Sequence, residues 1–251
     1  MISMKAITII TGPLRSGTSC VTGALERCGF DLGQNVRILR NETPMNPKGH
    51  FEPDLLYAIN ERLLLETPNG VWNPLHIPPE DAMAELAAAR ERYFHQFIRQ
   101  FDGEICKDPL FCFTLPFWER HWPELQRAIF CLRHPLAVAR SMNERYWISI
   151  ELGLTLWQTY TSRFFQCRKR SQTFVFDFDA FASAPLPVFA ELLNWLGRPL
   201  PEEELLQRFD GFFDSEYVHW EYGKAELEML PDAVRDLYAA LRSRAGALQE
   251  N

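Results

Sequence analysis

The chain of 251 residues is long enough for one large α/β domain with a full core. Its apolar content of 47% and charged content of 24% are ordinary for a globular protein, and no stretch approaches the roughly 20 apolar residues of a membrane-spanning helix. The net charge of −7 argues against nucleic-acid binding over a wide surface, so any anion site must be local.

The chain opens with a β-branched run that leads into a glycine-rich loop, and residues 7–20 read ITIITGPLRSGTSC. The apolar run predicts a strand, which breaks at Gly12, and a helical pattern follows Gly17. A strand, a tight loop and a helix in this order aim backbone N–H groups at an anion, although an ordinary strand-to-helix turn would read similarly. The loop is not a Walker A loop, because no lysine follows Gly17 and the cation is Arg15.

The next hundred residues predict two loops and two helices. Residues Phe30 to His50 are polar and rich in turn-forming residues, which indicates a long surface loop that ends in Lys48-Gly49-His50-Phe51-Glu52. A helix is expected from Pro53 to Glu66, and a second loop from Thr67 to Pro79. One amphipathic helix is expected from Glu80 to Phe101, with an apolar stripe that indicates core packing.

The rest of the chain alternates strands and helices. Strands are expected at Glu104–Leu110, Arg127–Leu132 and Thr173–Phe178, and helices near Leu115–Trp122, from Pro135, and at Leu152–Lys169, Leu186–Leu196, Glu202–Phe212 and Pro231–Leu248. This order predicts one α/β domain over residues 1–251, with a mostly parallel central sheet flanked by helices. The six cysteines show no C-x-x-C spacing, which favours reduced thiols in a cytoplasmic protein.

Three of the expected strands end at cations, namely Arg15, Lys107 and Arg133. Ligands of open parallel sheets bind beyond the carboxyl ends of the strands, so these cations would meet if the strands are parallel. Separate surface salt bridges are the alternative. Because Arg133 ends a strand where a P-loop NTPase would carry a magnesium-binding aspartate, the pattern predicts an anion held by protein cations without a metal. The histidines show no metal-ligand spacing in the sequence; they include His76, His95, His121 and His219.

Two motifs carry a family resemblance. The loop TGPLRSGTS resembles the 5′-phosphosulfate loop of sulfotransferases that use 3′-phosphoadenosine 5′-phosphosulfate (PAPS). The stretch IFCLRHPLAVARSM resembles their 3′-phosphate motif, in which a serine follows a strand-end arginine by eight residues, as Ser141 follows Arg133. The resemblance implies a P-loop nucleotide-kinase-like sulfotransferase fold. It is closer to the carbohydrate or bacterial type than to the small-molecule cytosolic branch, because no R-K-G segment occurs and Lys224 is a weak substitute.

The resemblance also implies roles for single residues. Arg133 and Ser141 would hold the 3′-phosphate, and Lys107 would neutralise charge on the transferring sulfuryl group. Glu52 is favoured as the general base and His50 is the alternative, because family branches use either residue type. The 5′-phosphosulfate would be held by the glycine loop, namely Arg15, Ser16, Gly17, Thr18 and Ser19. Arg15 stands where many family members carry a lysine, and it would also take part in catalysis.

The function implied is in-line transfer of a sulfuryl group from PAPS to an acceptor hydroxyl or amine, with release of PAP and without a metal. The acceptor would be a small molecule, a carbohydrate or a lipid, and no nucleic-acid partner is expected. Two other functions stay open: a P-loop-like nucleotide or small-molecule kinase, and a non-catalytic nucleotide-binding protein of the same fold. The sequence indicates neither the acceptor nor the oligomeric state.

Overall fold

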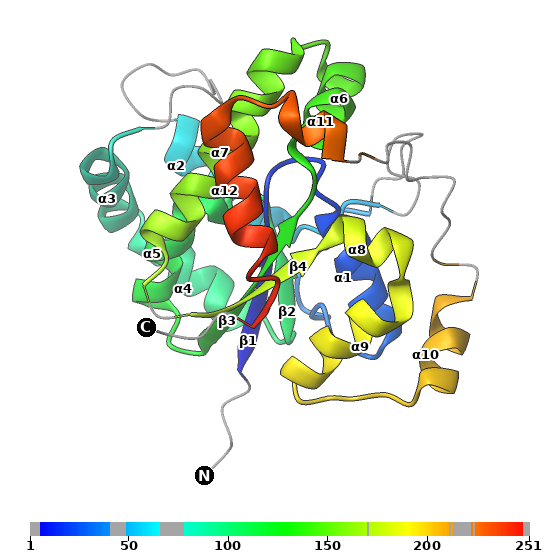
Figure 1. Cartoon of the computed structure of the whole chain (residues 1–251). Coiled ribbons are helices and arrows are strands. Elements are labelled where there is room, and N and C mark those ends of the chain that lie inside the picture. Colours follow the sequence, from blue (N-terminus) through cyan, green and yellow to red (C-terminus); the bar gives the residue numbers. More distant parts are fainter. Residues whose placement is uncertain are drawn as a thin grey trace.

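A mostly parallel sheet runs through the centre of the molecule (Figure 1). The computed structural model describes residues 6–40, 49–65, 78–169, 171–210, 212, 222 and 224–247. The strand order is β2-β1-β3-β4-β5, with β1 at Ile7–Thr11, β2 at Ile105–Lys107, β3 at Leu125–Leu132, β4 at Gln172–Asp177 and β5 at Gly246–Ala247. Strands β2, β1, β3 and β4 pair in parallel with one another, and β5 is antiparallel to β4. The expected mostly parallel sheet is therefore confirmed.

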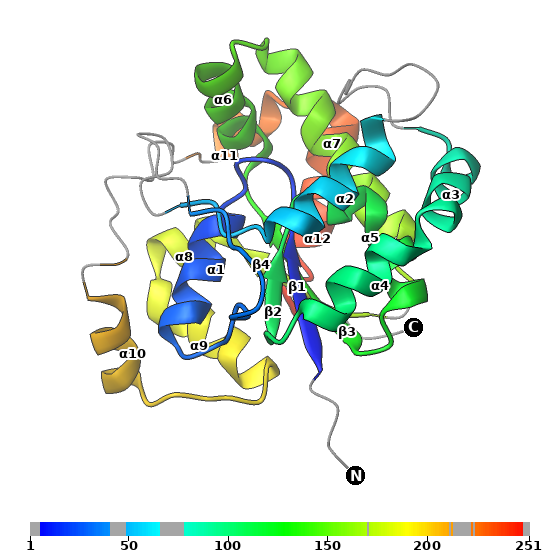
Figure 2. The ribbon, with the colours of Figure 1, turned by 180° about the vertical axis from the view of Figure 1, so that it is seen from behind.

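Helices cover both faces of this sheet (Figures 1 and 2). Their bounds are α1 Thr18–Arg27, α2 Asp54–Leu65, α3 Glu80–Ala89, α4 Glu91–Gln100, α5 Phe111–His121, α6 Pro135–Tyr146, α7 Ile150–Cys167, α8 Phe178–Ser183, α9 Pro185–Trp195, α10 Glu202–Phe209, α11 Lys224–Glu228 and α12 Asp232–Arg242. Alternate residues of β3 enter opposite clusters, with Phe130 packed on the side of α4, α5 and α7, and Cys131 packed on the side of α1 and α9. Because successive strand side chains point to opposite faces, one continuous apolar run serves both cores.

Three expected helices differ from the observed ones. The helix expected over 80–101 breaks at Arg90, whose φ of −118° is not helical, so that Phe94 and Phe97 of α4 face the core. Helix α5 begins at Phe111 rather than at Leu115, and Pro116 lies inside it. The last expected helix ends at Arg242, and the chain continues into β5, where Gly246 has a φ of 102° and pairs with β4.

Residues 41–48 lie outside the described residues, but the chain on both sides of them is paired. Leu39 N donates to Glu52 O at 2.8 Å, Phe51 N donates to Leu39 O at 2.8 Å, and Asp54 N donates to Arg37 O at 2.9 Å. The expected surface loop over 30–50 therefore ends in a short antiparallel pair. This pairing delivers Glu52 to the start of α2.

Two expectations from the sequence concerned the state of the cysteines and the absence of a membrane-spanning helix. No disulfide joins any of the six cysteines, all of which lie in the described part of the chain, and five of them are buried, as expected for reduced thiols. Among the described residues, no helix combines the length and apolar character needed to cross a membrane.

Candidate active site

The three strand-end cations lie at one edge of the sheet. Strand β1 pairs in parallel with both β2 and β3, so the ends that precede Arg15, Lys107 and Arg133 point the same way. Figure 2 shows the loop after β1 at the same end of the sheet as the start of α6. The predicted convergence of the cations at one edge is confirmed, and their contacts divide them into two groups.

The loop between β1 and α1 requires glycine at its last position. Gly17 has a φ of 91°, and a Cβ atom there would lie 2.2 Å from the Phe178 ring. Gly17 is also the N-cap of α1 and offers no side chain to the helix start. Because the first N–H groups of an α-helix have no acceptor within the helix, this end of α1 faces the loop with donors and a positive dipole. The loop has the geometry expected of an anion-binding site.

The first group joins the loop to the end of β3 and the middle of α6. Arg15 donates from Nε to Ser141 Oγ at 3.0 Å, and Arg133 donates from Nη1 to the carbonyl oxygen of Arg15 at 3.0 Å. Burial lowers the pKa of Arg15 and of Arg133, because desolvation penalises a charged guanidinium. Two partly desolvated guanidinium groups at close quarters favour an anion between them. The predicted pair Arg133 and Ser141 is thus brought together with Arg15.

Two buried polar atoms of this group lack partners. Arg133 Nε and Ser16 Oγ are buried and have no hydrogen-bond partner within the part of the chain that the structure describes. Buried donors are almost always satisfied in native proteins, so such atoms call for a water or a ligand. Both donors are therefore available to an anion at the loop.

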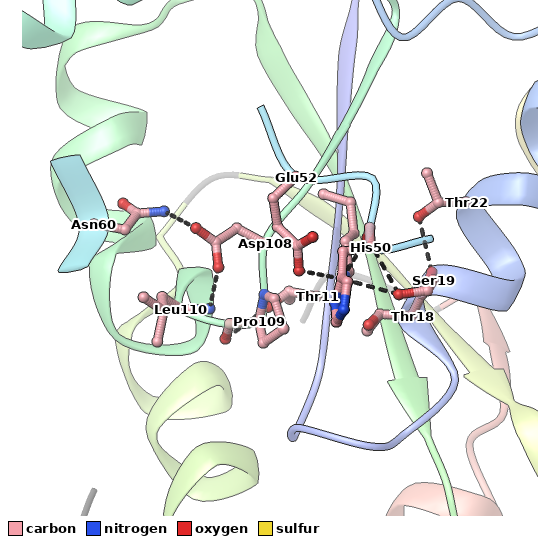
Figure 3. A network of polar contacts seen from close by, with 11 residues as sticks. Thr11, Thr18, Ser19, Thr22, His50, Glu52, Asn60, Asp108, Pro109 and Leu110 are labelled. Atoms are coloured by element: carbon pink, nitrogen blue, oxygen red, sulfur yellow. Dashed lines mark hydrogen bonds and ion pairs between the residues drawn. The ribbon is translucent and has the colours of Figure 1, made fainter. Parts of the chain in front are cut away.

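The second group is a buried ion pair at the first turn of α1 (Figure 3). Lys107 Nζ forms an ion pair with Glu52 Oε1, and it also donates to Ser19 Oγ at 3.1 Å and to the main-chain oxygen of His50 at 2.9 Å. Lys107 and Glu52 are both buried. Burying either charge alone would cost several kcal/mol, so each requires the other. The pair places a cation and a carboxylate directly beside the glycine loop.

His50 and Glu52 enter this group differently. Phe51 between them has a φ of 71°, an uncommon value for a bulky residue, and its side chain is buried. His50 contacts Lys107 through its main-chain oxygen, and burial lowers the pKa of its imidazole. Glu52 keeps its second oxygen, Oε2, without a partner among the described residues. Of the two candidate bases, only the Glu52 side chain is bonded into this group by the described contacts.

A neighbouring carboxyl group was not expected from the sequence. Asp108 is fully buried next to Lys107 in the chain, and Figure 3 shows it beside Glu52. Burial, with a smaller contribution from the Glu52 charge, raises the pKa of Asp108 to about 7. The sequence Lys107-Asp108-Pro109 could have indicated this residue, because Asp108 directly follows the lysine at the end of the strand.

Asn60 of α2 holds Asp108 in place. Its Nδ2 donates to Asp108 Oδ2 at 2.8 Å, while its Oδ1 accepts from Trp118 Nε1 at 2.6 Å and from Thr114 Oγ1 at 2.9 Å. Leu110 N donates to the other oxygen of Asp108 at 2.9 Å. These contacts join α2 to α5 behind the Lys107–Glu52 pair. Two other residues weighed in the sequence, Lys48 and the side chain of Lys224, lie outside what the structure describes.

Comparisons with known proteins bear on the fold. Neither the profile of a known protein family nor the sequence of a curated protein matches this chain. The sulfotransferase STF1 from Mycobacterium tuberculosis H37Rv matches over 95% of this chain and 78% of its own, with 14% identity and a TM-score of 0.52. The sulfotransferase domain from the curacin biosynthetic pathway matches over 94% of this chain and 97% of its own, with 14% identity and a TM-score of 0.48.

A third match is the sulfotransferase domain from the Synechococcus PCC 7002 olefin synthase, over 95% of this chain and 87% of its own, with 17% identity and a TM-score of 0.43. At these sequence identities the similarity shows the fold alone, and this conclusion rests on the comparison with STF1. The expected resemblance to sulfotransferases, made from two short motifs, extends over nearly the whole chain in three dimensions. The chain has the α/β fold of the sulfotransferases.

Proposed function

We propose that this protein is a PAPS-dependent sulfotransferase, which transfers a sulfuryl group in line to an acceptor hydroxyl or amine and releases PAP. The observation that carries the proposal is the meeting of two polar groups at one sheet edge. Arg15, Arg133 and Ser141 form a cationic group, and Lys107 and Glu52 form a buried ion pair. Arg15 of the glycine loop belongs to the first group, and Ser19 in the first turn of α1 contacts the second. A donor with phosphate at one end and sulfate at the other suits this division.

The residues present fit the donor. Arg133 and Ser141 would hold its 3′-phosphate. Arg133 Nε, which has no partner among the described residues, would donate a hydrogen bond to that phosphate. The 5′-phosphosulfate would lie against the loop, where Ser16 Oγ has no hydrogen-bond partner among the described residues. Arg15 contacts Ser141 and would therefore serve the phosphate as well as the sulfate side. The remaining loop contacts would come from Thr18 and Ser19.

When bound, the donor supplies an activated sulfuryl group, and the protein supplies charge and position. Lys107, held by Ser19 and by the His50 carbonyl, would stabilise negative charge that develops during transfer. Glu52 Oε2 would take the proton of the acceptor hydroxyl, a contribution of roughly 10²–10⁴-fold for a general base. His50 would fix Lys107 through its main chain, and its neutral imidazole is the second candidate base.

Ligand-dependent thermal stability tests the donor assignment. PAP at about 100 times its dissociation constant should add roughly 2.7 kcal/mol to the stability of the folded state. MgATP and adenosine 5′-phosphate should add little. The PAP effect should vanish in Arg133→Ala and persist in Arg235→Ala, which removes an exposed arginine paired with Asp232. Stabilisation by MgATP instead would favour the kinase function.

Turnover with labelled PAPS then tests the catalytic assignments. Glu52→Gln should lower kcat by roughly 10²-fold or more while PAP still binds. His50→Gln should have a smaller effect, and Lys107→Ala should lower kcat strongly. Binding of PAP without transfer to any acceptor would favour a non-catalytic nucleotide-binding protein. Wild-type turnover in all three variants would show that this active-site assignment is wrong.

A further inference from the structure

Three metal-ligating side chains meet at the end of the molecule opposite to the candidate active site. Glu91 and His95 lie one turn apart in α4, and His121 ends α5. Helix α5 starts after β2, beside Lys107, and its eleven residues run back for about 16 Å along the sheet. His121 therefore lies far from the proposed site, and its neighbours can be considered on their own.

Two of the three distances between the ligand atoms match those around a tetrahedral metal ion. Glu91 Oε1 lies 3.2 Å from His95 Nε2 and 3.6 Å from His121 Nδ1. All three atoms lie within 4.8 Å of one another. Zinc bonds of 2.0–2.1 Å at tetrahedral angles place two ligands about 3.4 Å apart. Two edges of the triangle are close to this length, and the third, between His95 and His121, is at most 4.8 Å.

The least exposed ligand is held by core packing. The His121 side chain is 9% exposed, and its ring packs 5.1 Å from the ring of Phe94, which in turn packs against Trp118. Because core packing already fixes the His121 ring, less side-chain freedom is lost when an ion binds.

We propose that Glu91, His95 and His121 bind a divalent transition-metal ion, with Zn²⁺ as the best match to two imidazoles and one carboxylate. Three protein ligands leave the fourth position to water on the exposed side of the cluster. The bound ion ties the first turn of α4 to the last turn of α5. The sequence showed no such site, because His95 and His121 are 26 residues apart and meet only in the fold.

Zinc titration of the chelator-treated full chain tests this site by calorimetry. Wild type should bind one Zn²⁺ at this cluster, and zinc should raise its Tm. Loss of a direct ligand in His95→Ala should weaken binding by more than the roughly tenfold that loss of an outer partner costs. His95 is 45% exposed, so this variant does not challenge folding. Glu204→Gln is the matched control, since it removes an exposed carboxylate from another i,i+4 pair, with Arg208.

Cobalt spectroscopy separates this cluster from the cysteines. Co²⁺ at two histidines and a glutamate should give visible absorption of a tetrahedral ion without the near-ultraviolet band of a thiolate ligand. The half-buried Cys20 is the thiol to exclude, and Cys20→Ser should bind zinc as wild type does. Equal zinc affinity in wild type and His95→Ala, a thiolate band, or no binding at micromolar zinc would each overturn the proposal. PAP binding is independent of these outcomes.

Discussion

Lys107→Met should lower the free energy of unfolding by about 3–5 kcal/mol, because it leaves a buried carboxylate without its cation. The side chains of Lys107 and Glu52 are 3% and 9% exposed, so water cannot replace the lost partner. Ser19 Oγ and the His50 carbonyl also lose a donor. The loss would be a large share of the 5–15 kcal/mol that stabilises an ordinary domain.

Removal of the carboxylate, with the lysine kept, should lower the free energy of unfolding by less. Glu52→Gln leaves Lys107 with the His50 carbonyl, Ser19 Oγ and an amide oxygen as acceptors, so we expect a loss of about 2 kcal/mol. The double variant Lys107→Met/Glu52→Gln removes both charges. It should be more stable than the sum of the single losses predicts, with a coupling energy of about 2 kcal/mol.

Urea unfolding followed by circular dichroism at pH 7.5 measures these differences. Arg235→Met, which breaks an exposed pair with Asp232, is the control and should change stability by about 0.5 kcal/mol or less. A Lys107→Met variant whose free energy of unfolding lies within about 1 kcal/mol of wild type would refute the reasoning.

Three further predictions concern the same end of the sheet. Since the pKa of Asp108 is raised to about 7, the folded state binds more protons than the unfolded state between about pH 4 and pH 7. Asp108→Asn should therefore gain stability relative to wild type as pH rises from 4.5 to 8, and a constant difference in urea titrations would contradict this. Gly17→Ala should cost several kcal/mol in thermal unfolding, because its Cβ meets the Phe178 ring, whereas Gly197→Ala, with a φ of 77° and nothing within 4 Å, should cost about 1 kcal/mol. A similar cost for both would exclude the steric reason. Ser141→Ala should weaken PAP binding by about tenfold or more in calorimetry and leave Tm nearly unchanged, and unchanged affinity would contradict its assignment to the 3′-phosphate.

Local signals predicted much of the framework. The strands of the parallel sheet show as short apolar runs, and their ends are marked by Arg15, Lys107 and Arg133. Once the sheet is parallel, topology alone brings those ends together. The eight-residue spacing from Arg133 to Ser141 likewise places both on one strand–helix junction, which the structure confirms.

What the sequence could not predict depends on distant contacts. Asn60 reads as one polar residue in a helix, and its burial depends on Trp118, which is 58 residues away. The break at Arg90 contains neither glycine nor proline, so packing of α4 rather than local propensity sets it. The family resemblance favoured Glu52 over His50, but the sequence could not predict that the Glu52 side chain pairs with Lys107 beside the left-handed backbone of Phe51.

Because the chain is paired on both sides of residues 41–48, the position of Glu52 does not depend on the sequence of that segment. Glu52 is placed by Leu39 and by its own neighbours, and a Cβ on Gly49 would lie 3.3 Å from Arg40 Cα, so the two ends of the segment nearly touch. Insertions, deletions or grafts between Arg40 and Gly49 therefore need not move the carboxylate. Sequence changes can be introduced there by evolution or by library selection while the Glu52 carboxylate keeps its position.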